Sequence, residues 1–255
     1  MGKDETKQNT HSKTMSLGDH LEELRFRIMF ALVGLAIGTI ICFFFGTKII
    51  TFIEAPYNAL MPDHPLSALA PADAFIGYMK VSLMSGLILS SPWVFYQLWM
   101  FVSAGLYAKE KRYMHIAVPF SVALFIGGAL FFLFVVAPIS LGFFIKFGRF
   151  MNVAPNWTFQ NYVSFVTVLM LVFGLGFQTP IAIFFLNKTN LVSLDALRKS
   201  RKYTLLCIFV LAAVATPPDV ISQITLAIPL YLLFELGIAL SYLSNRKKNL
   251  KNSDA

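Results

Sequence analysis

The amino-acid sequence predicts an all-α protein that crosses a membrane several times. Of its 255 residues, 57% are hydrophobic and only 13% are charged, and the mean hydropathy is +0.68. Several uncharged stretches reach the roughly 20 residues that a helix needs to cross a bilayer. Prolines at 92, 119, 180 and 229 fall inside these stretches. Because proline bends a helix, we expect the helices to form a concave bundle.

We expect one membrane domain at 16–245, between a disordered polar tail at 1–15 and a basic tail at 246–255. An amphipathic surface helix is predicted to lead into the first span. The six spans are predicted at about residues 28–46, 73–102, 113–138, 159–186, 203–216 and 220–243.

The segment after the first span and the last two spans need separate interpretations. Residues 47–72 hold four prolines and are expected to form a loop. The last two spans are short, since 203–216 would measure about 21 Å as a helix. They form either two short spans or one re-entrant pair. We prefer two spans in a thinned or tilted bilayer, because both flanks then lie on one side.

The cations indicate the orientation of the chain. With six spans, both termini and the loops at 103–112 and 187–202 share a side. These segments hold all but four of the 21 Lys and Arg residues. By the positive-inside rule, both termini are predicted to be cytoplasmic. The basic cytoplasmic face would then attract anionic lipids.

Two carboxylates near the ends of predicted spans are candidate binding groups. Glu23 and Glu110 share the cytoplasmic face and could together accept guanidinium groups, which bind carboxylates in a bidentate manner. The alternative is local ion pairing, with Glu23 bound to Arg27 four residues along the helix. The spacing alone favours this alternative.

Three polar residues interrupt the apolar stretches. Glu235 is expected to face protein, water or the interface, because a carboxylate in the bilayer is costly. Asp219 follows two prolines and is expected to cap the last span. Gln178 precedes Pro180, whose missing N–H leaves a carbonyl that an amide can satisfy. Structural and functional roles remain equally open for Gln178.

The sequence gives no indication of an enzyme. HExxH, GxSxG and Walker motifs are absent, and no His/Cys cluster suggests a metal or another cofactor. The two cysteines lie in apolar stretches and predict no disulfide. We expect no nucleic-acid partner.

Three motifs carry a resemblance to a known family. They are HLEELRFR at 20–27, SSPWVFYQLWMF at 90–101 with GLYAKEKR at 105–112, and TPPDVISQ at 216–223 with AIP at 227–229 and FE at 234–235. Together they resemble TatC, the core subunit of the twin-arginine protein translocase. The similarity extends over about residues 16–245.

The resemblance implies a receptor for twin-arginine signal peptides that exports folded proteins with the proton-motive force. It implies the partners TatA and TatB, homo-oligomers and a bacterial cytoplasmic (inner) membrane location. The thylakoid is disfavoured only by the missing transit peptide. Position by position, Glu23 and Glu110 would face the arginine pair, which reverses the preference for local ion pairing. The other family positions implied in signal-peptide binding are Arg25, Phe101, Tyr107 and Arg112.

Family positions with an implied structural or partner-contact role are Pro56, Gln178, Asp219 and Glu235. This chain departs from the family pattern at two places. Ser103 and Ala104 stand where most members have proline, and Gln178 stands where glutamate is common. Since glutamine does not titrate, we hypothesise that Gln178 acts through a hydrogen bond to a partner helix.

A small-solute transporter and a scaffold protein are the two alternatives to a signal-peptide receptor. A small-solute transporter would show internal repeats with matching broken helices and midplane charge pairs, and we find no convincing repeat. A scaffold for other membrane proteins would not depend on an arginine pair in its cargo.

Overall fold

The computed structural model describes residues 17–104, 114–153, 156–189, 191–215 and 220–253, and in them the all-α fold class is confirmed. The helices are α1 (Leu17–Phe44), α2 (Gly46–Leu60), α3 (Asp73–Ala104), α4 (Met114–Phe131), a π-helical segment (Phe132–Val136), α5 (Ala137–Phe150), α6 (Phe159–Gly176), α7 (Thr179–Lys188), α8 (Leu194–Lys199), α9 (Arg201–Ala215) and α10 (Val220–Ser253). The predicted tail at 1–15 lies outside the described residues, and α10 runs into the predicted C-terminal tail.

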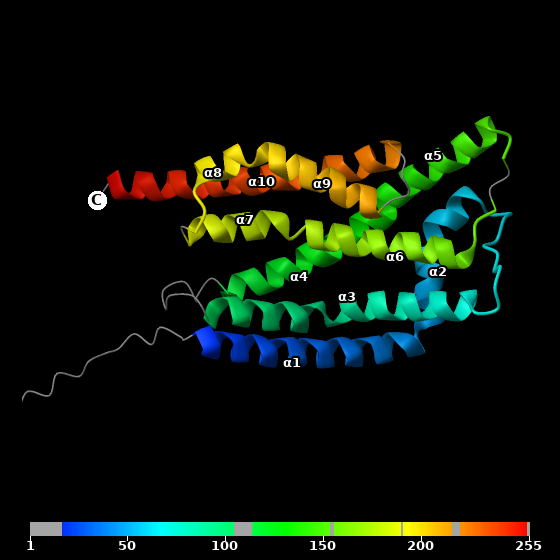
Figure 1. Cartoon of the computed structure of the whole chain (residues 1–255), viewed down its shortest axis with the longest axis horizontal. Coiled ribbons are helices and arrows are strands. Elements are labelled where there is room, and N and C mark those ends of the chain that lie inside the picture. The colour runs from blue at the N-terminus through cyan, green and yellow to red at the C-terminus, as the bar shows by residue number, and fades with distance from the viewer. Residues whose placement is uncertain (1–16, 105–113, 154–155, 190, 216–219, 254–255) are drawn as a thin grey trace, which may run out of the picture.

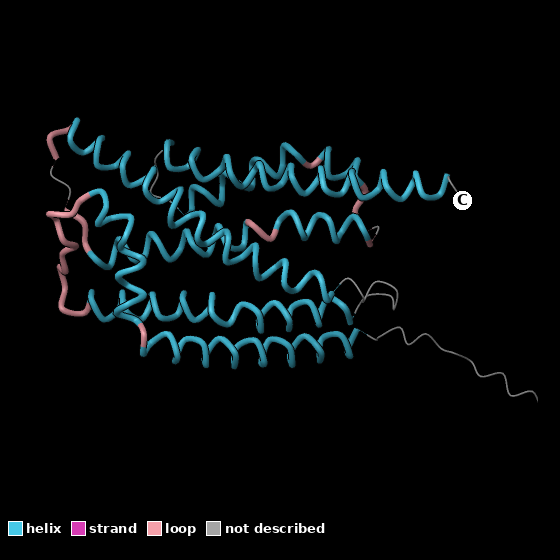
Figure 2. Tube along the Cα trace, turned by 180° about the vertical axis from the view of Figure 1, so that it is seen from behind, coloured by secondary structure: helices cyan, strands magenta, loops and turns pink. Residues whose placement is uncertain are grey.

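Most of the long helices lie side by side along one axis (Figure 1). Helices α4 and α5 cross the bundle obliquely, and α2 lies across the end at which α1 finishes (Figures 1 and 2). We call that end the distal side, and the end at which α1 begins the proximal side. Helices α3 and α7 finish on the proximal side, where α10 also ends.

Within the part of the chain that the structure describes, five helical stretches are long and apolar enough to cross a membrane. They are His20–Phe44, Asp73–Ser103, Ile116–Phe150, Phe159–Lys188 and Gln223–Asn245. The remaining predicted span corresponds to α9, which has only 15 residues. Helix α9 ends and α10 begins short of the far end of α5 (Figure 1). The six-span arrangement agrees with these helices, while the orientation of the termini stays a prediction.

Two predicted boundaries were wrong near the start of the chain. The surface helix and the first span form one continuous helix, α1. The segment predicted as a loop at 47–72 contains the 15-residue helix α2, with Pro56 inside it. Ile53, Pro56 and Tyr57 are buried on one face of α2, so packing offsets the hydrogen bond that proline removes.

The third predicted span ended at Pro138, but the helix continues to Phe150. Its turn before the proline is π-helical, from Phe132 to Val136. A π-turn widens the backbone, and this relieves the clash between a proline ring and the preceding turn. The helical path therefore continues past Pro138 as α5.

The distal side is held by hydrogen bonds between separate segments. Tyr162 on α6 donates to the carbonyl of Ile53 on α2 at 2.7 Å, in a buried position. Ser67 makes two backbone hydrogen bonds with the beginning of α6 and the residues before it. The N–H of Ser67 donates to the carbonyl of Trp157, and the N–H of Phe159 donates to the carbonyl of Ser67. These bonds fix α2 and the following loop against α6.

Candidate functional site

Three polar side chains meet where the proximal ends of α1 and α3 pack together. Arg27 donates through Nε to Glu23 Oε1 at 2.7 Å, and its Nη2 lies 2.6 Å from the same oxygen. Its Nη1 donates to Oε1 of Gln97 on α3 at 3.1 Å. Gln97 is 3% exposed, whereas the side chains of Arg27 and Glu23 are 24% and 27% exposed. The local ion pair expected from the spacing is therefore present, and Gln97 connects it to a second helix.

Arg27 engages only one oxygen of Glu23. Among the described residues, none donates a hydrogen bond to the other oxygen, Oε2. An ionised carboxylate offers about four acceptor positions. Oε2 of Glu23 is therefore left open to a further donor, while Arg27 orients the carboxylate through Oε1.

Aromatic rings close the same end of the helix pair. His20 on α1 stacks on Phe101 of α3, with ring centroids 4.5 Å apart and planes inclined by 27°. This contact brings the predicted residue Phe101 beside the beginning of α1, one turn from Glu23. Arg25 is exposed on α1, so its guanidinium is accessible at this end of the bundle.

The second predicted acidic residue, Glu110, lies outside the described residues, together with Tyr107 and Arg112. Helix α3 ends at Ala104 and α4 begins at Met114, both on the proximal side (Figure 1). The segment that carries Glu110 is therefore attached at the same end of the bundle as Glu23. The pairing of the two glutamates stays a prediction.

Gln178 ties α7 to α4 instead of satisfying the carbonyl freed by Pro180. Its Nε2 donates to the backbone carbonyl of Ser121 at 2.9 Å. The hydroxyl of Ser121 in turn accepts a 2.9 Å hydrogen bond from Trp99 Nε1 on α3. Three helices thus meet at Ser121. The hypothesis that Gln178 contacts a partner helix stays a prediction, and no described residue donates to its Oε1.

We expect Gln178→Leu to destabilise the protein by about 1 kcal/mol, because a hydrogen bond in the apolar bundle is lost. The measurement is the free energy of unfolding in mixed detergent micelles. Gln160→Leu is the matched control, since no described hydrogen bond is made by the Gln160 side chain. Equal stability of the two variants would show that the bond to Ser121 contributes nothing.

Two other predicted structural residues, Glu235 and Pro56, lie away from Glu23. Glu235 is held at the surface of α10, where Oε2 accepts from Arg201 Nη2 at 2.8 Å and Oε1 from Tyr231 at 3.0 Å. Both contacts are with side chains of this chain, and the implied partner-contact role of Glu235 stays a prediction. Pro56 is buried in α2 on the distal side, and Asp219 lies outside the described residues.

Two contributors to this site were assigned no binding role from the sequence. Gln97 lies in one of the motifs that carry the family resemblance. An amide inside an apolar stretch is the sequence signal that could have identified it as a contributor. Arg27 was treated only as a local ion-pair partner. Within the described residues, no group of three His, Cys, Asp or Glu side chains could hold a metal ion.

Long apolar helices with polar groups gathered at one end define a multi-span membrane protein with a candidate binding site on that end. The family model described as Sec-independent protein translocase protein (TatC) matches residues 19–229. The chain therefore belongs to the TatC family. Members of this family are components of a protein-transport system and are not enzymes.

Individual relatives agree with this assignment. The chain is 36% identical to the TatC protein of Desulforapulum autotrophicum, over 93% of this chain and 88% of that protein. It is also 36% identical to the TatC protein of Aquifex aeolicus, over 92% and 98% of the two chains. The crystal structure of a twin arginine translocase receptor, TatC, superposes with a TM-score of 0.81 at 35% identity, covering 89% of this chain and 99% of that one.

Proposed function

We propose that this chain is a receptor for twin-arginine signal peptides and the core of a translocase that exports folded proteins. The observation that carries the proposal is the half-buried Glu23 carboxylate, which has one oxygen on Arg27 and the other without a described donor. A carboxylate fixed in this way suits a second guanidinium, because the open oxygen can accept charge-assisted hydrogen bonds from it. The solved relative is itself described as a twin arginine translocase receptor.

In the proposed complex, Glu23 binds one arginine of the signal peptide and Glu110 binds the other. Phe101 stacks on His20 and provides an apolar wall for the methylene groups of the bound arginine. The remaining proposed contacts are Arg25, Tyr107 and Arg112.

The protein works in a complex with other translocase subunits, and we propose that these are the single-span proteins TatA and TatB. We further propose homo-oligomers, transport driven by the proton-motive force, and a bacterial cytoplasmic membrane with both termini in the cytoplasm. The proximal side is then cytoplasmic, and its cations contact anionic lipids.

Photo-crosslinking in native membranes tests the receptor assignment. A photoreactive amino acid replaces Phe26, one turn from Glu23, or Lys109, next to Glu110, so that both glutamates are kept. A signal peptide with an arginine pair is compared with its double-lysine form. We expect crosslinks at both positions with the arginine peptide and weak ones with the lysine peptide, because lysine lacks the planar fork.

Position 60 is the control site, since Leu60 is exposed but belongs to α2 on the distal side. Crosslinks that are equally strong with both peptides, or that appear equally at position 60, would contradict the proposed site. Absence of crosslinks at 26 and 109 in intact protein would leave Glu23 as a purely local ion-pair partner of Arg27.

A further inference from the structure

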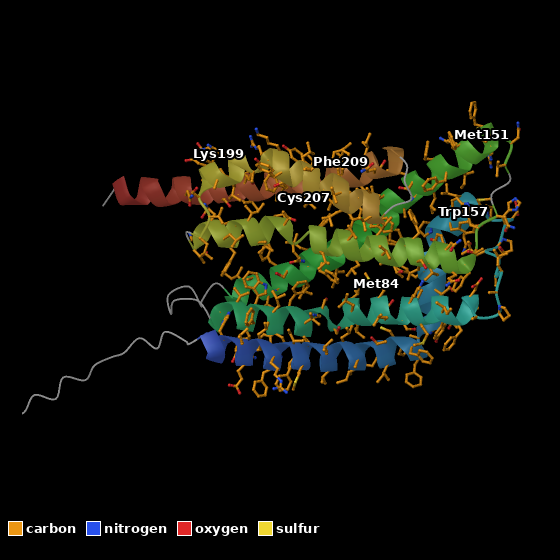
Figure 3. The ribbon with its side chains drawn as sticks, in the orientation of Figure 1. Met84, Met151, Trp157, Lys199, Cys207 and Phe209 are labelled. Carbon is orange, nitrogen blue, oxygen red and sulfur yellow. The ribbon has the colours of Figure 1, made fainter. Side chains whose placement is uncertain are left out.

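A groove on the side of the bundle lies between α1, α3 and α6, away from Glu23. Its volume is about 330 Å³, within the range of small-molecule sites. Its floor includes Met84, which lies between α3 and α6 (Figure 3). Leu83 and Val168 line it and are 52% and 47% exposed, so the groove opens to the surroundings of the bundle.

One charged side chain lines this groove. Lys80 Nζ donates to Ser164 Oγ at 2.7 Å, and that hydroxyl donates onward to the carbonyl of Gln160. The ion pairs of the described residues are Arg27–Glu23 and Arg201–Glu235, so no described carboxylate neutralises Lys80. An ammonium group has three donors, and two of them are free to bind an anion.

The groove is polar at one end and apolar along its length. Lys80 and Ser164 lie about two turns inside α3 and α6, close to the distal side. About two turns deeper, the lining is provided by Leu87 and Leu171. This order matches a phospholipid whose phosphate lies at the distal membrane surface and whose acyl chain points toward the bilayer centre.

We propose that this groove binds one anionic glycerophospholipid of the distal leaflet. Its phosphate accepts hydrogen bonds from Lys80, and one acyl chain lies along the leucines between α3 and α6. A carboxylate on another protein's transmembrane helix would match the charge, but the polar end lies at headgroup depth. The site is therefore distinct from the cations of the proximal face.

Native mass spectrometry of the full chain, delipidated in detergent, tests this proposal. Phosphatidylglycerol and phosphatidylcholine with the same acyl chains are titrated separately. We expect one tight phosphatidylglycerol site that Lys80→Gln weakens about tenfold, because a charge-assisted hydrogen bond is lost. Lys146→Gln, at an exposed cation on α5, is the matched control and should leave this site unchanged.

Two further variants keep the test decisive if Lys80→Gln does not fold. Lys80→Arg retains the cation and should keep the tight site, whereas Val168→Trp fills the groove and should remove it. Equal binding of the two lipids, or unchanged binding in Val168→Trp, would overturn the proposal. Crosslinks from position 83 in native membranes that reach only protein and no phospholipid would also overturn it.

Discussion

Replacing Glu23 by glutamine is expected to lower the affinity for a twin-arginine signal peptide by about ten- to a hundredfold. Glutamine keeps the shape of the side chain but loses the charge that the incoming guanidinium requires. The contact with Arg27 is weakened by the same change, so the remaining oxygen is also less well oriented. Fluorescence anisotropy with a labelled peptide and purified protein measures this effect.

Glu22 provides the matched control for this prediction. It is the neighbouring carboxylate, it is exposed, and it has no described ion pair. Glu22→Gln should therefore change the affinity by less than about twofold, because an exposed charge contributes little. The difference between the two variants should shrink at high salt, which screens the contact. Binding that survives the double substitution Glu23→Ala, Glu110→Ala would rule out the proposed site.

Gln97 explains why Glu23 can serve as more than a surface ion-pair partner. An isolated pair between residues four apart on a helix contributes only about 0.2–0.5 kcal/mol and leaves both side chains mobile. Here the buried amide of Gln97 holds Arg27, and Arg27 holds one carboxylate oxygen. The spacing of the sequence predicts the pair, but only the packing of α3 on α1 shows that it is anchored.

The helical class was predictable because long apolar stretches have few alternatives in a membrane. The errors at α2 and at Pro138 came from treating proline as the end of a helix. Ile49, Ile53 and Tyr57 are spaced four apart, so the helical pattern of α2 was present around Pro56. At Pro138 the local π-turn keeps the helix intact, and such a turn has no clear sequence signature.

Contacts between distant helices could not be predicted from one sequence. Nothing in the order of residues indicates that the amide of Gln178 reaches the carbonyl of Ser121, or that Lys80 reaches Ser164. Those pairings depend on which helix faces are adjacent, and each helix offers several faces of similar hydrophobicity. The spacing of Gly34 and Gly38 permits close packing of the first span, but it does not identify the partner helix.

Gly86→Ala is expected to destabilise the protein by about 1–3 kcal/mol, because α1 and α3 touch at this glycine. A Cβ atom at Gly86 would lie 2.5 Å from the Cα and 2.6 Å from the N of Thr39. On the other helix, a Cβ at Gly38 would lie 2.7 Å from the carbonyl oxygen of Gly86. All of these atoms belong to the backbone, so a side-chain rotation cannot relieve the overlap and the helices must separate.

Gly127→Ala is the matched control, because its added Cβ would meet no atom within 4 Å. It should leave stability unchanged or raise it by up to about 1 kcal/mol through helix propensity. Unfolding in mixed micelles measures both variants, and equal results would contradict the close contact. Because Arg27 and Gln97 lie on the same helix pair, separation at Gly86 should also weaken signal-peptide binding. Stability and binding should therefore fall together in Gly86→Ala, whereas Glu23→Gln should lower binding with a stability loss of only about 0.2–0.5 kcal/mol.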